Sequence, residues 1–338
     1  MKRFEKTKGF IIGIAVCLFI NALFIPVLAQ NVTKQLTAYY KNIRIILNGE
    51  ELSLKNVAGD IVEPFIVDGT TYLPVRALAE ALDFWVSWDE ETQAVIIDSD
   101  LSEFETEIKS EPRNPPPILM LGTENTPLVL EYHSIADTPS GITAENFEGQ
   151  IKYLADKGYT FLFPEEIHDC DKYDKSVILT FDDGYRDNYE TAFGILKKYN
   201  AKATIFMITN YIGKTIREDE FLTANQIKEL EESGLVRVES HTHNHKDLSA
   251  LINEKGGENK VRIQLINSAA ALKEITGRDH KVLCYPYGGF DDEVKKIVSE
   301  YYDIAFATWR GSRRDMFGLY RDAIYNDMTA FTKLIDAD

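Results

Sequence analysis

Two adjacent carboxylates, Asp182 and Asp183, follow directly on the apolar run at residues 178–181. Ionised carboxylates in contact repel each other and raise each other's pKa unless a cation lies beside them. An apolar run that ends at such a pair is typical of a buried strand that reaches the protein surface. The pair is therefore either a solvated turn or one part of a site that binds a positive charge.

Three of the six histidines lie in the segment SHTHNH at residues 240–245. His241 and His245 are four residues apart, so one helical turn would place both rings on the same side, with His243 off that face. Two imidazoles and one carboxylate form a facial ligand set that leaves positions on a divalent metal open for water and substrate. Asp183 would supply that carboxylate and leave its neighbour free as an ionised base.

The elements that must position these residues alternate from residue 127 to the end of the chain. Residues 176–181 and 236–240 are predicted strands, and each is followed directly by one of the two polar motifs. Alternating strands and helices predict βαβ units in a parallel sheet or barrel, whose functional groups collect at the C-terminal strand ends. Two such motifs at two such ends favour a catalytic site over two unrelated polar loops.

The composition is that of an ordinary folded protein, with 44% apolar and 27% charged residues among 338. A net charge of -17 argues against nucleic acid and anionic lipid as partners, because no basic stripe is present to neutralise phosphates. A neutral or cationic polymer suits this charge better. Cys170 and Cys284 lack CxxC spacing, which argues against a zinc–thiolate site and leaves one disulfide or plain burial.

Residues 1–29 indicate export and are not expected to be part of the folded domains. Basic residues precede a long apolar run that ends at Ala29, which is the pattern of a secretory signal peptide. The run is nearly as long as the roughly 20 residues that span a bilayer, so an uncleaved membrane anchor is the alternative. We therefore expect a secreted protein or one associated with the cell surface or cell wall, with membrane contact only through this segment.

A small domain is predicted at residues 41–98. Its pattern indicates two hairpins and an amphipathic helix over Leu73–Leu82, in which Leu78 and Ala81 share a face with Leu82. The segments LNGEEL, YLPVRALAEAL and VSWDEETQAVII resemble the copper amine oxidase N-terminal-like domain. That resemblance implies a spacer or wall-adhesion module.

The region before the alternating strands has two further properties. No histidine precedes His133, so no copper site is expected in the small domain despite the family name. The clustered prolines at residues 99–126 hold a backbone extended and predict a semi-rigid linker.

The alternating region, residues 127–338, carries three motifs in succession: TFDDGY, HTHNH and CYPYGGF. They resemble the motifs of the polysaccharide deacetylases, the NodB-homology or carbohydrate esterase family 4. Members of that family adopt an irregular barrel of parallel strands and use a divalent metal to hydrolyse acetyl groups from sugars. The predicted fold class is therefore α/β: an irregular parallel (β/α) barrel, preceded by a small α+β domain and an N-terminal signal or anchor helix.

Carried over residue by residue, the resemblance makes Asp182 the general base and assigns the metal to Asp183, His241 and His245. The backbone amide of Tyr287, within YPYG, would stabilise the oxyanion. Zinc is the expected metal, with cobalt, nickel and manganese as alternatives, because mixed nitrogen and oxygen ligands accept several metals.

The chain also departs from the usual pattern of that family. Most members protonate the leaving amine with a late histidine, and no histidine follows His280 here. His133, in LEYHSI, instead resembles the acid of the circularly permuted poly-N-acetylglucosamine deacetylases. Cys284 stands where many members carry an arginine that steadies the catalytic aspartate, and Arg321 is predicted to take its place. Thr242 matches a position that orients a metal-bound histidine.

Expectations for four further residues concern their role or their environment. Asp315 fits the permuted subgroup without an assigned role, and Trp309 either stacks on sugar rings or packs in the core. His168 and His280 fall in predicted loops and are expected to be solvated.

These observations favour an exported, metal-dependent hydrolase that removes N-acetyl groups from an N-acetylglucosamine polymer, either peptidoglycan, poly-N-acetylglucosamine or a chitin-like glycan. One alternative is a polysaccharide O-acetyl esterase that uses the same residues. A second alternative, from another class, is a non-catalytic protein that binds the cell wall.

Overall fold

The computed structural model describes residues 37–47, 50–52, 62–80, 84–89, 94–98, 120–121, 125–138, 141–254, 256–308 and 311–337. The predicted signal or anchor, Trp309, and Ala81 with Leu82 lie outside the described residues. Among the described residues, no helix combines the length and apolarity needed to cross a membrane. The chain divides into two compact units, residues 1–41 with 65–72 and residues 42–64 with 73–338. The domain boundaries given above stay predictions.

The N-terminal region contains short antiparallel sheets and one short helix. In the first unit, β1 (Tyr39–Tyr40), β4 (Phe65–Val67) and β5 (Thr70–Tyr72) form a three-stranded sheet. The second unit contains two two-stranded sheets and a helix: β2 (Ile45–Leu47) with β3 (Glu50–Leu52), β6 (Trp85–Asp89) with β7 (Ala94–Asp98), and α2 (Val75–Glu80). The two predicted hairpins are confirmed, and the predicted helix begins after Pro74 rather than at Leu73.

The alternating region folds into a sheet whose strands are all parallel, in the order β16-β15-β14-β11-β10-β8-β17, with β9 beside β10. Leu319 forms a parallel bridge to β16, and β17 then pairs with β8, so one segment connects the last strand to the first. The predicted irregular parallel (β/α) barrel is therefore confirmed. The strands are β8 (Leu128–Tyr132), β9 (Thr160–Phe161), β10 (Ser176–Phe181), β11 (Ala203–Met207), β14 (Val236–Ser240), β15 (Val282–Cys284), β16 (Ile304–Phe306) and β17 (Asp322–Ala323).

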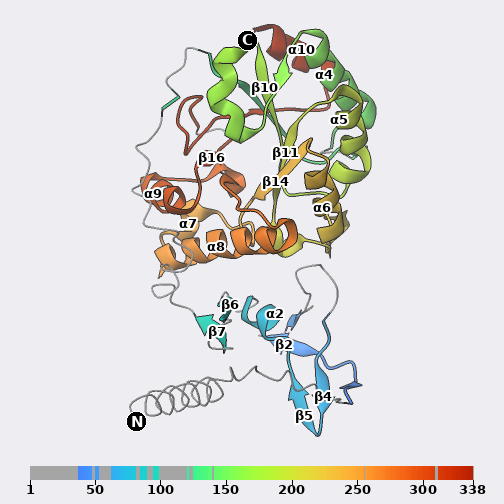
Figure 1. Ribbon diagram of the computed structural model, residues 1–338, viewed down its shortest axis with the longest axis vertical. Helices are drawn as coiled ribbons and strands as arrows, with labels where there is room; N and C mark the ends of the chain where they lie inside the picture. Colours follow the sequence, from blue (N-terminus) through green and yellow to red (C-terminus); the bar gives the residue numbers. More distant parts are fainter. Residues whose placement is uncertain are drawn as a thin grey trace, which may run out of the picture. The chain divides into compact units, whose positions relative to one another are not determined.

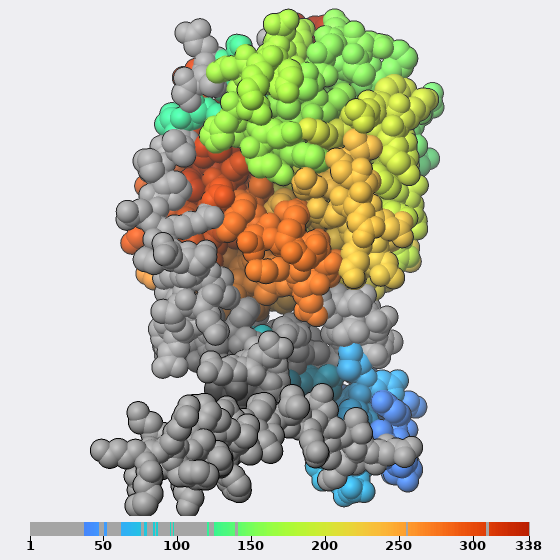
Figure 2. All heavy atoms as spheres, in the orientation of Figure 1, coloured from blue at the N-terminus to red at the C-terminus, as the bar shows by residue number. Residues whose placement is uncertain are grey.

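Helices surround this sheet, as Figure 1 shows for α4, α5, α6 and α8 around β10, β11 and β14. α6 and α8 pack side by side and form one continuous surface, yellow and orange in Figure 2. Local signals fix their starts: Thr223 caps α6 in a capping box with Gln226, and Thr143 accepts a hydrogen bond from Asn146 at the start of α4. The remaining elements of this region are short or helical, namely α4 (Ala144–Asp156), η1 (Pro164–Lys172), η2 (Asn188–Ala192), α5 (Phe193–Tyr199), η3 (Thr209–Tyr211), β12 (Thr215–Ile216), β13 (Asp219–Glu220), α6 (Ala224–Glu232), α7 (Leu248–Leu251), α8 (Gly257–Thr276), η4 (Pro286–Gly288), α9 (Asp292–Tyr301) and α10 (Met328–Ala337).

The strands are buried on both faces, which explains why β8 and β10 read as nearly continuous apolar runs. In β8, Leu128, Leu130 and Tyr132 pack in one hydrophobic cluster, whereas Val129 packs in the other. Alternate residues therefore face the helices and the barrel interior. Glu131 shares the interior face with Val129, so the interior becomes polar toward the C-terminal strand ends.

The end of the predicted linker packs on the barrel. Leu121 is buried, and its backbone N–H donates to the carbonyl of Arg314 at 2.9 Å. Met120 forms an antiparallel bridge with Asp315, whose carboxylate accepts a hydrogen bond from the backbone of Phe317 at 3.0 Å. The contacts of Asp315 are therefore structural.

Candidate active site

Segments far apart in the sequence meet at the C-terminal ends of β10 and β14. Oδ1 of Asp183 lies 3.6 Å from Nε2 of His241 and 3.5 Å from Nε2 of His245. The two Nε2 atoms are 3.2 Å apart. The structure thus brings together the three side chains that the sequence predicts as metal ligands.

The spacing of these three atoms fits one divalent cation. Ligand atoms that bind a single ion at about 2.1 Å lie about 3.0 to 3.4 Å from one another in tetrahedral or octahedral sites. Burial, together with the neighbouring His241, lowers the pKa of His245 to about 4, so this ring is neutral at pH 7 and keeps a lone pair for a metal. Two imidazoles and one carboxylate would suit zinc and several related ions.

The backbone that brings the histidines together is not helical, which corrects the predicted helical turn. No helix covers residues 241–245, and both Thr242 (φ 65°) and His245 (φ 54°) adopt left-handed conformations. Asp183 (φ 71°) and Tyr287 (φ 59°) do so as well. Each such residue costs about 1 to 3 kcal/mol, and strain of this kind collects at functional sites because the surrounding fold enforces it.

Gly184, the glycine of the DDG motif, stands where the backbone conformation favours glycine. Its φ is 79°, and a Cβ atom added there would lie 2.2 Å from Sδ of Met207. Glycine adopts this φ without strain, and a larger residue would also have to displace the side chain of Met207. In this turn, Asp182 and Asp183 point to different partners.

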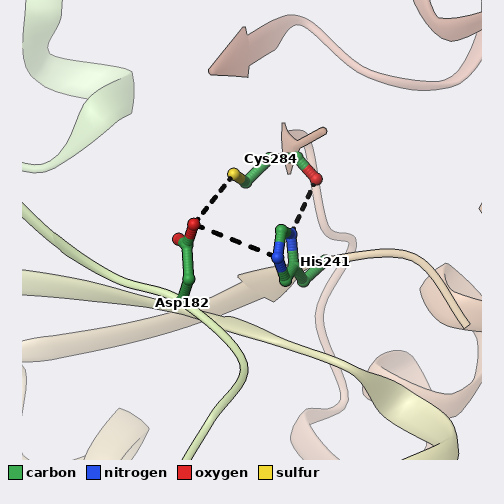
Figure 3. Close-up of side chains that lie close together, drawn as sticks. All are labelled: Asp182, His241 and Cys284. Carbon is green, nitrogen blue, oxygen red and sulfur yellow. Dashed lines mark hydrogen bonds and ion pairs between the residues drawn. The ribbon is translucent and has the colours of Figure 1, made fainter. Parts of the chain in front are cut away.

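The ring of His241 is held by a backbone carbonyl group. Nδ1 of His241 lies 2.9 Å from the carbonyl oxygen of Cys284 (Figure 3). Its other ring nitrogen, Nε2, lies 3.6 Å from Oδ1 of Asp183. The hydroxyl of Thr242 is buried and has no hydrogen-bond partner within the described part of the chain. The carbonyl of Cys284, at the end of β15, therefore holds the His241 ring, and the orienting role of Thr242 stays a prediction.

Asp182 is held by a buried arginine rather than by a cation site. Nη1 and Nη2 of Arg321 donate to Oδ1 and Oδ2 of Asp182, both at 2.7 Å. Burial alone would raise the pKa of Asp182, but the charges of Arg321 and then His241 lower it further than burial raises it. The carboxylate is therefore ionised at neutral pH, as a general base must be.

A second convergence, of Asp182, His241 and Cys284, is a poorer metal site. Sγ of Cys284 lies 3.5 Å from Oδ2 of Asp182, and Oδ2 lies 3.9 Å from Nε2 of His241 (Figure 3). Burial raises the pKa of the Cys284 thiol, which keeps it protonated, and Asp182 is already paired with Arg321. Cys284 and Cys170 are both buried free thiols, so the disulfide alternative is wrong.

Arg321→Met is expected to destabilise the protein by about 3 to 5 kcal/mol, because it leaves the buried Asp182 carboxylate without its counter-charge. Urea unfolding followed by circular dichroism measures the loss. Arg186→Met is the matched control, since Arg186 pairs with an exposed carboxylate and is expected to cost about 1 kcal/mol or less. Equal costs for the two variants would show that the buried pair adds nothing to stability.

His133, the predicted acid, stands at the mouth of the barrel and is exposed. Its ring nitrogen lies within 4.8 Å of carboxylate oxygens of both Glu131 and Asp182. Sequence reasoning missed Glu131, which is buried beside Arg321. The available signal was a charged residue inside an otherwise apolar strand, at the alternate position before His133.

The other histidines lie away from the cluster. Nδ1 of His243 is 2.9 Å from the hydroxyl of Thr209, and burial lowers the pKa of His243 to about 3. His280 is buried beside Glu239, which corrects the expectation that it is solvated. His168 is exposed, as expected.

Tyr287 borders the cluster on the side of His245. Its ring centroid is 4.6 Å from that of His245, and its side chain is 64% exposed. The oxyanion role of its backbone amide stays a prediction, as do the catalytic roles of Asp182, His133 and Arg321.

Comparison with known proteins assigns both parts of the chain. The family model described as polysaccharide deacetylase matches residues 170–302, and that of the copper amine oxidase N-terminal domain matches residues 26–97 and 54–112. YxkH of Bacillus subtilis, whose name places it among the polysaccharide deacetylases, is 34% identical over 199 residues, which cover 57% of this chain and 68% of YxkH.

Two further similar proteins carry more specific names. The poly-beta-1,6-N-acetyl-D-glucosamine N-deacetylase of Staphylococcus epidermidis is 35% identical over 174 residues, 47% of this chain and 58% of that protein. The Streptococcus pyogenes deacetylase PplD, solved in complex with acetate, superposes with a TM-score of 0.56 at 28% identity and covers 63% of this chain and 98% of that one. Together with the barrel and its clustered side chains, these matches show that the chain belongs to the polysaccharide deacetylase family.

Proposed function

We propose that this protein is a metal-dependent N-deacetylase that hydrolyses acetamido groups of an N-acetylglucosamine polymer at the cell surface. The observation that carries the proposal is the convergence of Asp183, His241 and His245 beside an Asp182 that Arg321 keeps ionised. The name of the Staphylococcus epidermidis relative supports the substrate class, and the predicted signal or anchor supports the location.

Asp183, His241 and His245 would hold the cation. When bound, a divalent ion lowers the pKa of water and polarises a carbonyl group. Zinc suits the donor set, and cobalt, nickel or manganese suit it too.

The chain's own residues divide the proton transfers between them. Asp182 takes a proton from the attacking water, and His133 gives a proton to the amide nitrogen as the C–N bond breaks. The products are acetate and a free amine on the sugar. The backbone N–H of Tyr287 is assigned to the oxyanion that forms on the acetyl carbonyl. The exposure of His133 suits its role as the acid, because the leaving amine is part of a polymer that approaches from solvent.

The test is acetate release from poly-N-acetylglucosamine, chitin oligomers and peptidoglycan, each with and without a chelator. We expect release from at least one of these glycans, and loss of release when metal is removed. A metal-loaded protein that binds a glycan but releases no acetate from any of them would be a non-catalytic wall-binding protein.

His133→Ala separates the N-deacetylase from the O-acetyl esterase alternative. An amine departs only when protonated, whereas an alkoxide needs less help, so the variant is expected to lose about 10² to 10⁴ in kcat on an amide and markedly less on an ester. Rates on an N-acetylated and an O-acetylated glycan measure the difference. His168→Ala, which alters an exposed histidine in η1, is expected to leave both rates unchanged. Unaltered amide hydrolysis by His133→Ala would remove His133 from the mechanism.

A further inference from the structure

Glu131 is a buried carboxylate that the mechanism above does not use. Glu131 is 6% exposed and lies on the interior face of β8, two positions before His133. Oε2 of Glu131 lies 3.2 Å from Nη2 of Arg321, and the same Nη2 donates to Asp182 at 2.7 Å. Within the described residues, Oε2 has no hydrogen-bond partner.

Burial raises the pKa of the Glu131 carboxyl group, and the charge of Arg321 together with a hydrogen bond from Thr308 opposes that rise only in part. Arg321 supplies one positive charge, and its two Nη atoms are already paired with the two oxygens of Asp182. A bound cation is disfavoured where Glu131, His133 and Asp182 converge, because the guanidinium lies against both carboxylates. The remaining group that can become positive within reach is His133, whose ring nitrogen lies within 4.8 Å of the Glu131 carboxylate.

We propose that Glu131 is a positioning residue for the acid step: its carboxylate holds the protonated ring of His133 at the barrel mouth, where the leaving amine departs. His133 lies on the same face of the strand as Glu131, because successive side chains of a strand alternate between faces. A carboxylate beside an imidazolium both orients the ring and stabilises its charge. This inference rests on the proposed N-deacetylase activity.

A purely structural role for Glu131 makes a different prediction. If Glu131 only held Arg321, its removal would disturb Asp182, which removes a proton from water with either substrate. Amide and ester hydrolysis would then fall together. If Glu131 acts through His133, amide hydrolysis falls more than ester hydrolysis, because the acid matters more for nitrogen leaving groups.

The experiment compares Glu131→Gln with the unaltered holoenzyme on an N-acetylated and an O-acetylated glycan. We expect kcat/KM on the amide to fall about tenfold more than on the ester, the size of one charge-assisted hydrogen bond. Glu166→Gln is the matched control. Glu166 pairs with Lys202, which directly precedes β11, so this pair lies at the opposite ends of the strands from the site. The variant is expected to leave the amide-to-ester ratio unchanged. Glu131→Leu removes the charge without burying an amide and is expected to shift the ratio in the same direction.

A double-variant cycle completes the test. In a His133→Ala background, Glu131→Gln is expected to cause no further selective loss on the amide, because the two residues act as one unit. An unchanged amide-to-ester ratio in both Glu131 variants overturns the inference. If the unaltered protein itself hydrolyses no amide, the proposed function fails, and the inference fails with it.

Discussion

Asp182→Asn is expected to lower acetate release by about 10² to 10⁴ while the protein keeps its metal. The asparagine amide has nearly the same shape as the carboxylate but cannot take the proton that the carboxylate accepts. Arg321 loses its charged partner, while the asparagine side chain still fills the space of Asp182. The assay is single-turnover acetate release, with metal content measured by elemental analysis on the same sample.

Asp183→Asn is the matched variant, because it changes the adjacent residue in the same way. Oδ1 of Asp183 faces the two ring nitrogens at 3.5 and 3.6 Å, so this variant is expected to lose the metal together with the activity. Both residues stand at the same strand end, and only their partners differ. A metal-free Asp182→Asn beside a metal-bound Asp183→Asn would mean that the two roles are interchanged.

Much of this site was predictable because strand ends are readable in the sequence. The runs before Asp182 and before His241 each mark a strand, and parallel strands place their C-terminal ends at one edge of the sheet. β10 and β14 are not neighbours, since β11 lies between them, yet the rule still brings the two motifs together. The barrel and the predicted ligand set therefore followed from pattern and resemblance.

The parts that sequence reasoning missed depend on local backbone shape and on distant partners. Two left-handed residues, Thr242 and His245, replace the expected helical turn, and nothing in their side-chain types requires that conformation. Spacing does not reveal that a carbonyl of Cys284 orients His241. The burial of His280 likewise follows from its packing beside Glu239 and not from its own neighbours in the sequence.

The contacts of Arg321 and Glu131 also depend on residues that are distant in the sequence. Arg321 reaches Asp182 from 139 residues further along the chain, so its contact was inferred from resemblance alone. Glu131 was visible as a charge within an apolar strand, but its meaning depends on which residues share the barrel interior. Register across neighbouring strands, and not the strand itself, determines those neighbours.

His241→Ala is expected to abolish both metal binding and activity, because it removes one of three ligands that the cation would need. A ligand that binds only the folded protein stabilises it by mass action, about 2.7 kcal/mol when its concentration is a hundred times Kd. The unaltered protein should therefore melt at a higher temperature in the presence of zinc than after chelation. In His241→Ala this difference should disappear.

His243→Gln provides the control within the same loop. His243 is two residues from His241 and equally buried, but its Nδ1 contacts Thr209 and the Asp183 cluster does not include it. Replacing it changes the packing of the loop without removing a ligand, so the melting temperature without metal can fall while the increase on adding zinc remains. The comparison thus depends on the zinc-induced increase and not on stability itself. If His241→Ala kept that increase and His243→Gln lost it, the cation would belong to a different set of side chains from the one that converges at β10 and β14.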